Sequence, residues 1–261
     1  FDWGIRGAAI ATVSAQVIAL LWQLKQFNNA NELLHFRRGI FRLKRKIVFD
    51  SLAIGMSPFL MNLAACLIVI LINQGLKKYG GDLAIGAFGI VNRLVFIVVM
   101  IVMGLNQGMQ PIAGYNFGAK LYDRVNKVLK LTIIYATCVT TFGFLVGMLA
   151  PNLVVGIFTS DAELTELSAT GLRITVMFFP IIGFQMVTSN FFQSIGMAGK
   201  AIFLSLTRQM LILLPCLLIL PHFFGVAGVW YSMPVSDLLA SLIALVMLVY
   251  QFRKFKTAAA H

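Results

Sequence analysis

Seven long apolar segments constrain this chain more than any other feature of its sequence. A helix that crosses a bilayer needs about 20 consecutive, mostly apolar residues, and each segment is at least that long. The segments cover residues 4–27, 48–74, 84–108, 126–150, 166–192, 200–221 and 226–251. One core cannot bury so much apolar surface. We therefore predict an all-α, polytopic membrane helical bundle with about seven transmembrane helices.

The charged residues support a membrane protein rather than a nucleic-acid-binding one. Only 11% of residues are charged, although the net charge is +12. Most basic residues lie in short connections between the apolar segments, as they do in proteins that orient with the positive side inside. We expect the lipid bilayer as a partner and no nucleic acid. The 3 cysteines lie inside apolar runs without metal-ligand spacing, so we expect no metal site.

The connections alternate in charge, and this alternation predicts the topology. Basic connections follow the first segment and the third, whereas 151–166 carries acids but no Lys or Arg and 222–225 carries no charge. The positive-inside rule then places the amino terminus outside and the carboxy terminus in the cytoplasm. Lys77 and Lys78 are the exception, since they fall on the predicted outer side.

Two short stretches predict helix starts outside the membrane core. The basic segment 35–47 is expected to form a short amphipathic helix at the membrane surface. Ser160 and Glu163 have the spacing of a capping box, so we expect the fifth helix to start there.

The chain carries no recognisable catalytic signature. Hydrolase, nucleotide-binding and zinc-protease motifs are missing from the sequence, and the 3 histidines fall at segment ends or in the tail. We therefore expect no catalytic residues and no enzyme. Polar groups at membrane depth are expensive to place there, so they are the better candidates for function.

Asp237 in the last segment is the clearest of these polar groups. A carboxyl at that depth should face the bundle interior, where it serves as a proton or cation site or as a structural group bonded to nearby Ser or backbone. The structural role is slightly favoured because Pro234 frees a carbonyl nearby, and Asp237 is the ion-coupling candidate. Arg93 either pairs with a carboxyl, contacts substrate or snorkels outward. Arg208, nearer the predicted cytoplasmic side, is expected to snorkel.

Amides within the segments are the candidates for a binding cavity. Gln185, Ser189 and Gln193 recur every four residues and so share one helix face. Such a stripe suits a water-filled cavity for organic solutes, whereas any single amide is more simply an interhelical hydrogen bond worth about 0.6–2 kcal/mol. The cavity candidates are Asn62, Asn92, Arg93, Gln107, Gln185, Ser189, Asn190 and Gln193.

One stretch carries a specific family resemblance. Residues 104–120 read GLNQGMQPIAGYNFGAK. This run resembles the multidrug and toxic compound extrusion (MATE) transporters, in which such a run ends one helix and enters a cytoplasmic loop. Three further stretches are similar to the same family in the same order, at 4–12, 192–196 and 225–237.

The resemblance implies a domain organisation. Members of that family have two six-helix lobes, and this chain looks like the sixth helix followed by the carboxy-terminal lobe. Residues 1–27 would then be the last helix of the amino-terminal lobe, 28–47 a cytoplasmic basic linker with the amphipathic helix, 48–252 the six-helix lobe and 253–261 a cytoplasmic tail. The missing amino-terminal lobe of the same protein would be a partner.

The resemblance also implies a function in the bacterial inner membrane. That function is export of cationic or amphipathic small-molecule drugs in exchange for H⁺ or Na⁺, with no cofactor besides the coupling ion. Some branches place coupling carboxylates on the seventh and tenth helices, but Asp50 and Glu166 lie only at the edges of the matching segments here. Coupling is therefore expected mainly in the other lobe. Pro58, Pro180 and Pro234 mark positions where helices can bend.

Two other classes are weighed against this one. A lipid-linked oligosaccharide or polysaccharide flippase of related architecture should show several central cations, whereas only Arg93 is a candidate. A retinal photoreceptor needs a lysine in its last span, and 226–251 contains none.

Overall fold

The computed structural model describes residues 4–29, 35 and 43–259, and within those ranges every regular element is a helix. The elements are α1 (Gly4–Phe27), α2 (Arg45–Gly118), α3 (Tyr122–Leu149), α4 (Pro151–Val155), α5 (Ala162–Val176), α6 (Phe179–Ser194), α7 (Ala198–Leu206), η1 (Thr207–Leu213), α8 (Leu214–Phe224) and α9 (Val226–Ala259). The predicted all-α fold class is confirmed.

The chain divides into two compact units, Phe1–Gly55 and Met56–His261. The first unit contains α1, whose bounds equal the first predicted segment, and the beginning of α2. The predicted amphipathic helix at 35–47 falls mostly on 36–42, which lie outside the described residues. Leu43 and Lys44 precede the helix that begins at Arg45. The second unit contains everything that follows and holds the candidate site.

The described helices include several that can cross a membrane. The stretches Phe59–Gly118, Tyr122–Leu149, Gly199–Phe224 and Val226–Phe252 are long and apolar enough, and the pair α5 and α6 is a fifth if it counts as one bent span. The chain is therefore a multi-pass membrane protein.

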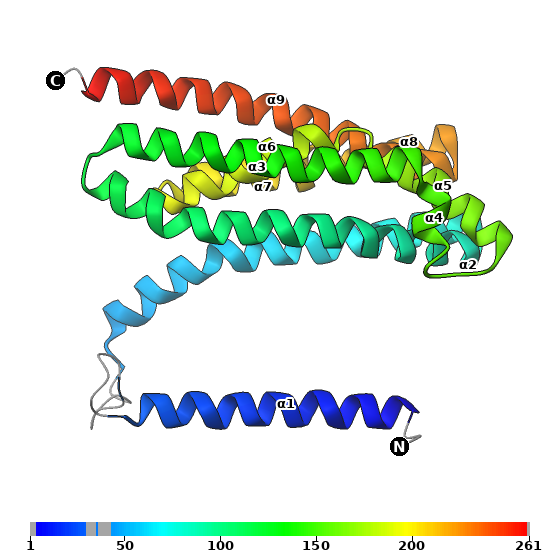
Figure 1. Ribbon diagram of the computed structural model, residues 1–261, viewed down its shortest axis with the longest axis horizontal. Helices are drawn as coiled ribbons and strands as arrows, with labels where there is room; N and C mark the ends of the chain where they lie inside the picture. Colours follow the sequence, from blue (N-terminus) through cyan, green and yellow to red (C-terminus); the bar gives the residue numbers. More distant parts are fainter. Residues whose placement is uncertain (1–3, 30–34, 36–42, 260–261) are drawn as a thin grey trace. The chain divides into compact units, whose positions relative to one another are not determined.

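The first of these stretches is two spans joined at a glycine. A straight helix of 60 residues would be about 90 Å long, roughly three times the hydrocarbon core. Gly81 breaks it with φ 65° and ψ −162°, a conformation that residues with a Cβ rarely adopt. Figure 1 shows the cyan part of α2 running to one end of the second unit and the blue-green part returning. The predicted loop at 75–83 thus shrinks to a single residue.

The segment after residue 108 differs from the prediction. The sequence predicts that the third span ends at 108, but the helix continues to Gly118 because Met109 and Ala113 keep the buried face going. A tight turn follows, in which Lys120 has φ 59° and the Leu121 amide donates to the Asn116 carbonyl at 2.9 Å. α3 then begins at Tyr122 rather than at 126.

The fifth predicted segment is bent. α5 and α6 meet at 54° across Met177 and Phe178. Pro180 lies in the first turn of α6, where its missing N–H costs no helical bond, so the predicted bend at this proline is confirmed. The helix start is also shifted. Asp161 rather than Ser160 is the N-cap, and its carboxylate accepts from the Leu164 amide at 3.1 Å.

The sixth predicted segment contains an irregularity that sequence reasoning missed. Residues Thr207–Leu213 form a π-helical stretch, η1, between α7 and α8. The Leu214 amide donates to the Gln209 carbonyl, five residues back. Pro215 follows at once and has no N–H for an ordinary helical bond. Such stretches occur often at functional sites.

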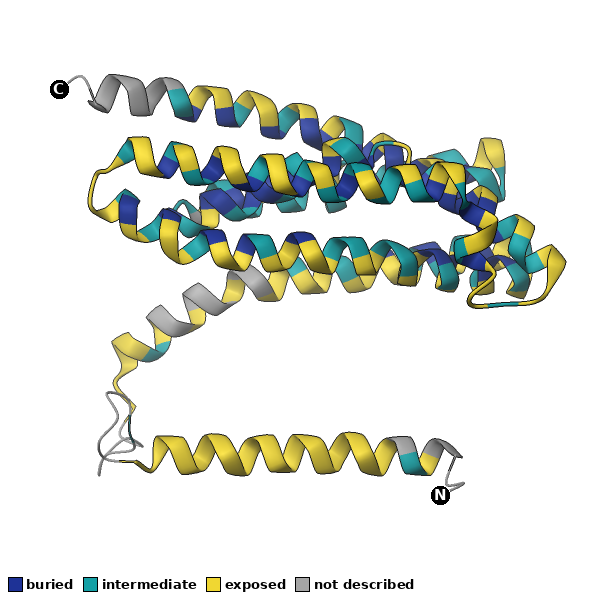
Figure 2. Ribbon diagram, viewed as in Figure 1, coloured by how far each residue is buried: buried dark blue, intermediate teal, exposed yellow. Residues whose placement is uncertain are grey.

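The second unit packs around two apolar clusters. One gathers residues of α2, α5, α6, α8 and α9, where the rings of Phe88 and Trp230 lie 5.9 Å apart. The other surrounds the fully buried Phe191 and Phe192 of α6. Figure 2 shows the buried residues on the faces that helices turn toward one another and exposed residues outward. The outward residues are largely apolar, as lipid contact requires.

Candidate functional site

A cavity of about 260 Å³ lies inside the second unit and is lined by some of its polar side chains. Its walls come from α2, α5, α6, η1 and α9. The polar side chains among its lining residues are Asn92, Thr175, Arg208, Gln209, Ser236 and Asp237. Apolar residues, including Phe88, Phe179, Met186 and Met233, form most of the remaining wall. A space of this kind can hold an apolar body with a charged or polar end.

An ion pair between Arg208 and Asp237 dominates the cavity. The Arg208 Nη2 and Nε atoms both lie 2.7 Å from Oδ1 of Asp237. The Asp237 side chain is 4% exposed, whereas that of Arg208 is 33% exposed. The sequence predicts that Arg208 snorkels outward, and this prediction is wrong, because its guanidinium turns to a buried carboxylate. Asp237 faces the bundle interior, but its partner is Arg208 rather than a nearby serine.

The π-helical stretch places Arg208 in the wall. Arg208 and Leu213, five residues apart, both line the cavity together with Gln209. In a regular α-helix the face repeats every 3.6 residues, so residues five apart do not share a face. The wider i→i+5 ladder of η1 brings them together. Asp237, the partner of Arg208, lies one turn after Pro234 in α9.

Some polar side chains of the cavity wall already have a hydrogen-bond partner within the protein, and others remain available to a ligand. Thr175 Oγ1 donates to the Gly171 carbonyl at 2.8 Å, and Ser236 Oγ donates to the Met233 carbonyl at 2.7 Å. By contrast, the buried Gln209 Oε1 has no hydrogen-bond partner among the described residues. A buried polar atom without a partner costs about 1–3 kcal/mol. The side-chain oxygen Oε1 of Gln209, a lining residue of the same cavity, is thus an available acceptor.

The described charges of the cavity cancel. One guanidinium and one carboxylate line it, and they are already paired. A cation that approaches Asp237 must therefore displace Arg208 or share the carboxylate with it. Breaking a buried pair is costly unless the new ligand replaces the lost interaction.

The structure scatters most of the predicted cavity residues. Asn92 lines this cavity, whereas the other predicted residues are not among its lining residues. Ser189 Oγ lies 3.1 Å from Ser205 Oγ across to α7, and Asn190 Nδ2 donates to the Met186 carbonyl at 3.0 Å. Gln185 is buried. Exposed positions are taken by Asn62, Arg93, Gln107 and Gln193.

The predicted stripe on α6 does not form one wall. Its middle member, Ser189, bonds to α7, and its end, Gln193, is exposed. Helical spacing groups these residues on one face, but it does not reveal that α7 lies against Ser189 there. Sequence reasoning also missed Arg208 and Gln209 as cavity residues, and the signal available was Pro215, which disturbs the helical ladder just after them.

The comparisons with known proteins agree on one family. A family model described as MatE matches residues 53–219. The multidrug export protein MepA of Staphylococcus aureus (strain MSSA476) is 27% identical over 257 residues, which cover 97% of this chain and 55% of that protein. MepA of Staphylococcus saprophyticus is 24% identical over 253 residues, with the same 97% and 55% shares. The chain thus spans about half the length of the curated relatives it matches.

Solved structures give the same result for the fold. A structure of the MATE multidrug transporter DinF-BH superposes with a TM-score of 0.82 at 36% identity and covers 97% of this chain and 56% of that one. An outward-facing MATE family transporter superposes with a TM-score of 0.83 at 21% identity and covers 98% of this chain and 58% of that one. The second likeness bears on the fold alone.

Proposed function

Because the chain belongs to the MatE family of transporters, we propose that it is part of a multidrug antiporter. The complete transporter would export organic cationic or amphipathic compounds in exchange for H⁺ or Na⁺. The curated relatives carry the name multidrug export protein. Since this chain spans about half their length, transport would also need a second, amino-terminal lobe.

The observation that carries this proposal is the Arg208–Asp237 pair inside the cavity. The Asp237 carboxylate can hold Arg208, a coupling ion or the cationic end of a drug, but it cannot hold all three at once. An ion that displaces Arg208 from Asp237 releases the guanidinium into the cavity, and a free guanidinium repels a cationic drug. Two ligands that weaken one another at a single carboxylate satisfy the reciprocal coupling that exchange requires.

The cavity wall supports amphipathic substrates. Phe88, Phe179, Met186 and Met233 supply aromatic and thioether surface around the ion pair. Methionine adapts to differently shaped apolar ligands, and flexible methionine-rich surfaces are typical of promiscuous binding. A flippase for phosphate-bearing lipids is less well supported, because the cationic side chain of this wall is already neutralised by Asp237.

The distribution of charge supports an orientation in the bacterial inner membrane. Lys120, Arg124 and Lys127 lie around the turn from α2 to α3, and Asp161 and Glu163 lie at the start of α5. Figure 1 places the α2–α3 turn and the last turns of α9 at the same end of the second unit, with the α5 start at the other. We place the basic end and the carboxy terminus in the cytoplasm.

An efflux assay tests the proposal. Bacteria that lack their own drug exporters and express the complete two-lobe protein should tolerate ethidium and fluoroquinolones better than cells with the empty vector. The present chain alone, reconstituted in liposomes with an imposed proton or sodium gradient, should form no ethidium gradient. Equal drug sensitivity at verified membrane expression would contradict the proposed export. A gradient formed by the chain alone would contradict the need for a second lobe.

A further inference from the structure

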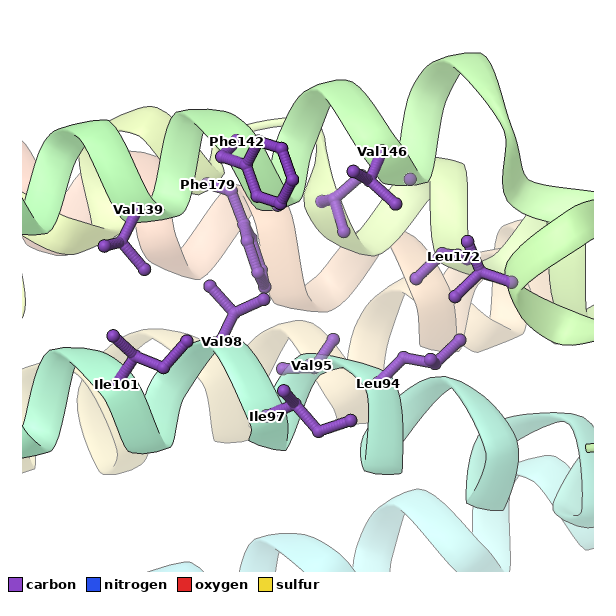
Figure 3. A pocket seen from close by; sticks show the side chains of 14 residues that line it. Leu94, Val95, Ile97, Val98, Ile101, Val139, Phe142, Val146, Leu172 and Phe179 are labelled. Carbon is purple, nitrogen blue, oxygen red and sulfur yellow. The ribbon is translucent and has the colours of Figure 1, made fainter. Parts of the chain in front are cut away.

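A second cavity, quite different from the first, opens on the outside of the second unit. Its volume is about 210 Å³, and its lining residues carry no charged or amide side chain. Figure 3 shows Val98 and Ile101 of α2 pointing toward Val139 and Phe142 of α3 across this space. Phe142 is 69% exposed and Ile97 58% exposed, so the cavity communicates with the surroundings of the bundle. For a membrane-spanning helix pair, these surroundings are hydrocarbon.

An apolar stripe along α3 leads to the mouth of this cavity. Exposed residues recur on it at spacings of three and four, which keeps them on one side of the helix. The residues of the stripe are Leu131, Ile134, Tyr135, Cys138, Phe142 and Leu145. The opposite face of α3 is buried against the bundle through Val125, Leu129 and Ala136. The stripe therefore faces lipid from its beginning to the cavity.

Two cations continue the same face toward the end of the helix. Lys127 lies four residues before Leu131, and Arg124 lies seven residues before it, so both are in register with the stripe. Both side chains are exposed, and the described residues give neither one an ion-pair partner. Lys120 in the preceding turn adds a third positive charge, and Asp123 is the acid of the first turn of α3. Clustered basic residues at a span end attract anionic headgroups.

The distance between the cations and the cavity fits one leaflet. From Lys127 to Phe142 the helix rises by about 22 Å at 1.5 Å per residue. A bilayer with its headgroup regions is about 40–45 Å thick, so one leaflet occupies roughly 20–22 Å. We propose that this face of α3 holds one anionic phospholipid, with its phosphate at Arg124 and Lys127 and an acyl chain in the cavity between α2 and α3. The two cavities share Val95 and Phe179 in their walls, but Arg208 and Asp237 line only the other one.

Lipid competition tests the headgroup half of the site. The protein is reconstituted in nanodiscs of equal phosphatidylglycerol and phosphatidylcholine, extracted in mild detergent and analysed by native mass spectrometry for retained lipid. Phosphatidylglycerol should be retained preferentially, and Arg124→Gln with Lys127→Gln should reduce its retention by at least about fivefold. The matched control, Lys77→Gln with Lys78→Gln, removes the same charge at the other end and should change retention little.

Photolabelling tests the acyl-chain half. Phosphatidylglycerol with a diazirine at the end of its acyl chain should label peptides that contain 94–101 and 139–147. Val139→Phe, which fills the cavity without changing charge, should abolish that labelling, whereas Ile134→Phe on the open stripe should not. Equal retention of both lipids would indicate only bulk lipid contact and overturn the proposal. Labelling that neither Val139→Phe nor the Arg124/Lys127 double variant reduces would overturn it as well.

Discussion

Arg208 and Asp237 form an ion pair in the bundle, but their side chains differ in burial and in flexibility. Asp237 is 4% exposed and carries its charge on a short side chain, whereas Arg208 is 33% exposed and carries its charge on a long, flexible stem. Removing one partner of a buried pair costs about 3–5 kcal/mol when the other charge stays buried. An arginine that loses its carboxylate can move its head toward solvent or the interface, but the aspartate cannot.

This asymmetry predicts a ranked set of variants. Arg208→Gln should lower the unfolding temperature of the detergent-solubilised protein more than Asp237→Asn does, because only the first leaves an unpaired buried charge. The double variant should be more stable than Arg208→Gln alone. In the efflux assay, Asp237→Asn should reduce drug export if the carboxylate couples ion and drug. A reversed stability order would contradict the paired geometry, and unchanged export by a well-expressed Asp237→Asn protein would leave this carboxylate a structural role.

Sequence reasoning could predict one half of this pair and not the other. A carboxylate within an apolar span must turn inward, so the burial of Asp237 follows from position alone. Its partner lies 29 residues earlier, on a helix whose register is not regular. The position of Arg208 near the predicted cytoplasmic side suggests only that it snorkels outward. The same limit applies to Ser189, because its spacing predicts the helix face on which it lies but not that α7 packs against it.

At the scale of elements, Pro215 accounts for the π-helical stretch that shapes the cavity wall. It removes the N–H that would bond to Leu211, and the preceding amides bond five residues back instead. The spans from residue 59 onward were predictable because each is a continuous apolar run. Their internal breaks were predictable only where a proline or glycine marks them, as at Pro180.

Replacing this proline should therefore act on the cavity from a distance. Pro215→Ala restores the missing donor and should convert η1 into an ordinary α-helix, which turns Arg208 away from Asp237. Drug export should fall to the level of Arg208→Gln, and the two changes combined should fall no further, because they remove the same interaction. Pro221→Ala in the same helix is the matched control and should leave export intact. Additive losses would show that Pro215 acts by another route.

At the scale of the whole molecule, the second unit has chemically different ends. Basic residues gather around the α2–α3 turn, while the start of α5 carries acids. The sequence alone predicts this polarity, since it depends on which connections are basic rather than on how the helices pack. Packing decides how the polar groups between the two ends are paired.

This difference in charge between the two ends predicts from which side of the membrane each end can be labelled. With the three native cysteines replaced by serine or alanine, Lys127→Cys should react with a membrane-impermeant maleimide only in inverted vesicles, and Glu163→Cys only in intact cells. The positive-inside rule gives the direction. Labelling of both positions from the same side, or of Glu163→Cys only in inverted vesicles, would contradict the proposed orientation.

The π-helical stretch also changes how the span that contains it responds to a loss of length. A single deletion in a regular helix rotates every later side chain by about 100° and turns its faces away from their neighbours. The hydrogen bonds of Thr207–Leu213 span five residues, one more than in an α-helix. Deleting one residue there would regularise the helix and leave α7 and α8 facing as they do now. We therefore expect a one-residue deletion within this stretch to preserve the fold. The Arg208–Asp237 pair would be lost.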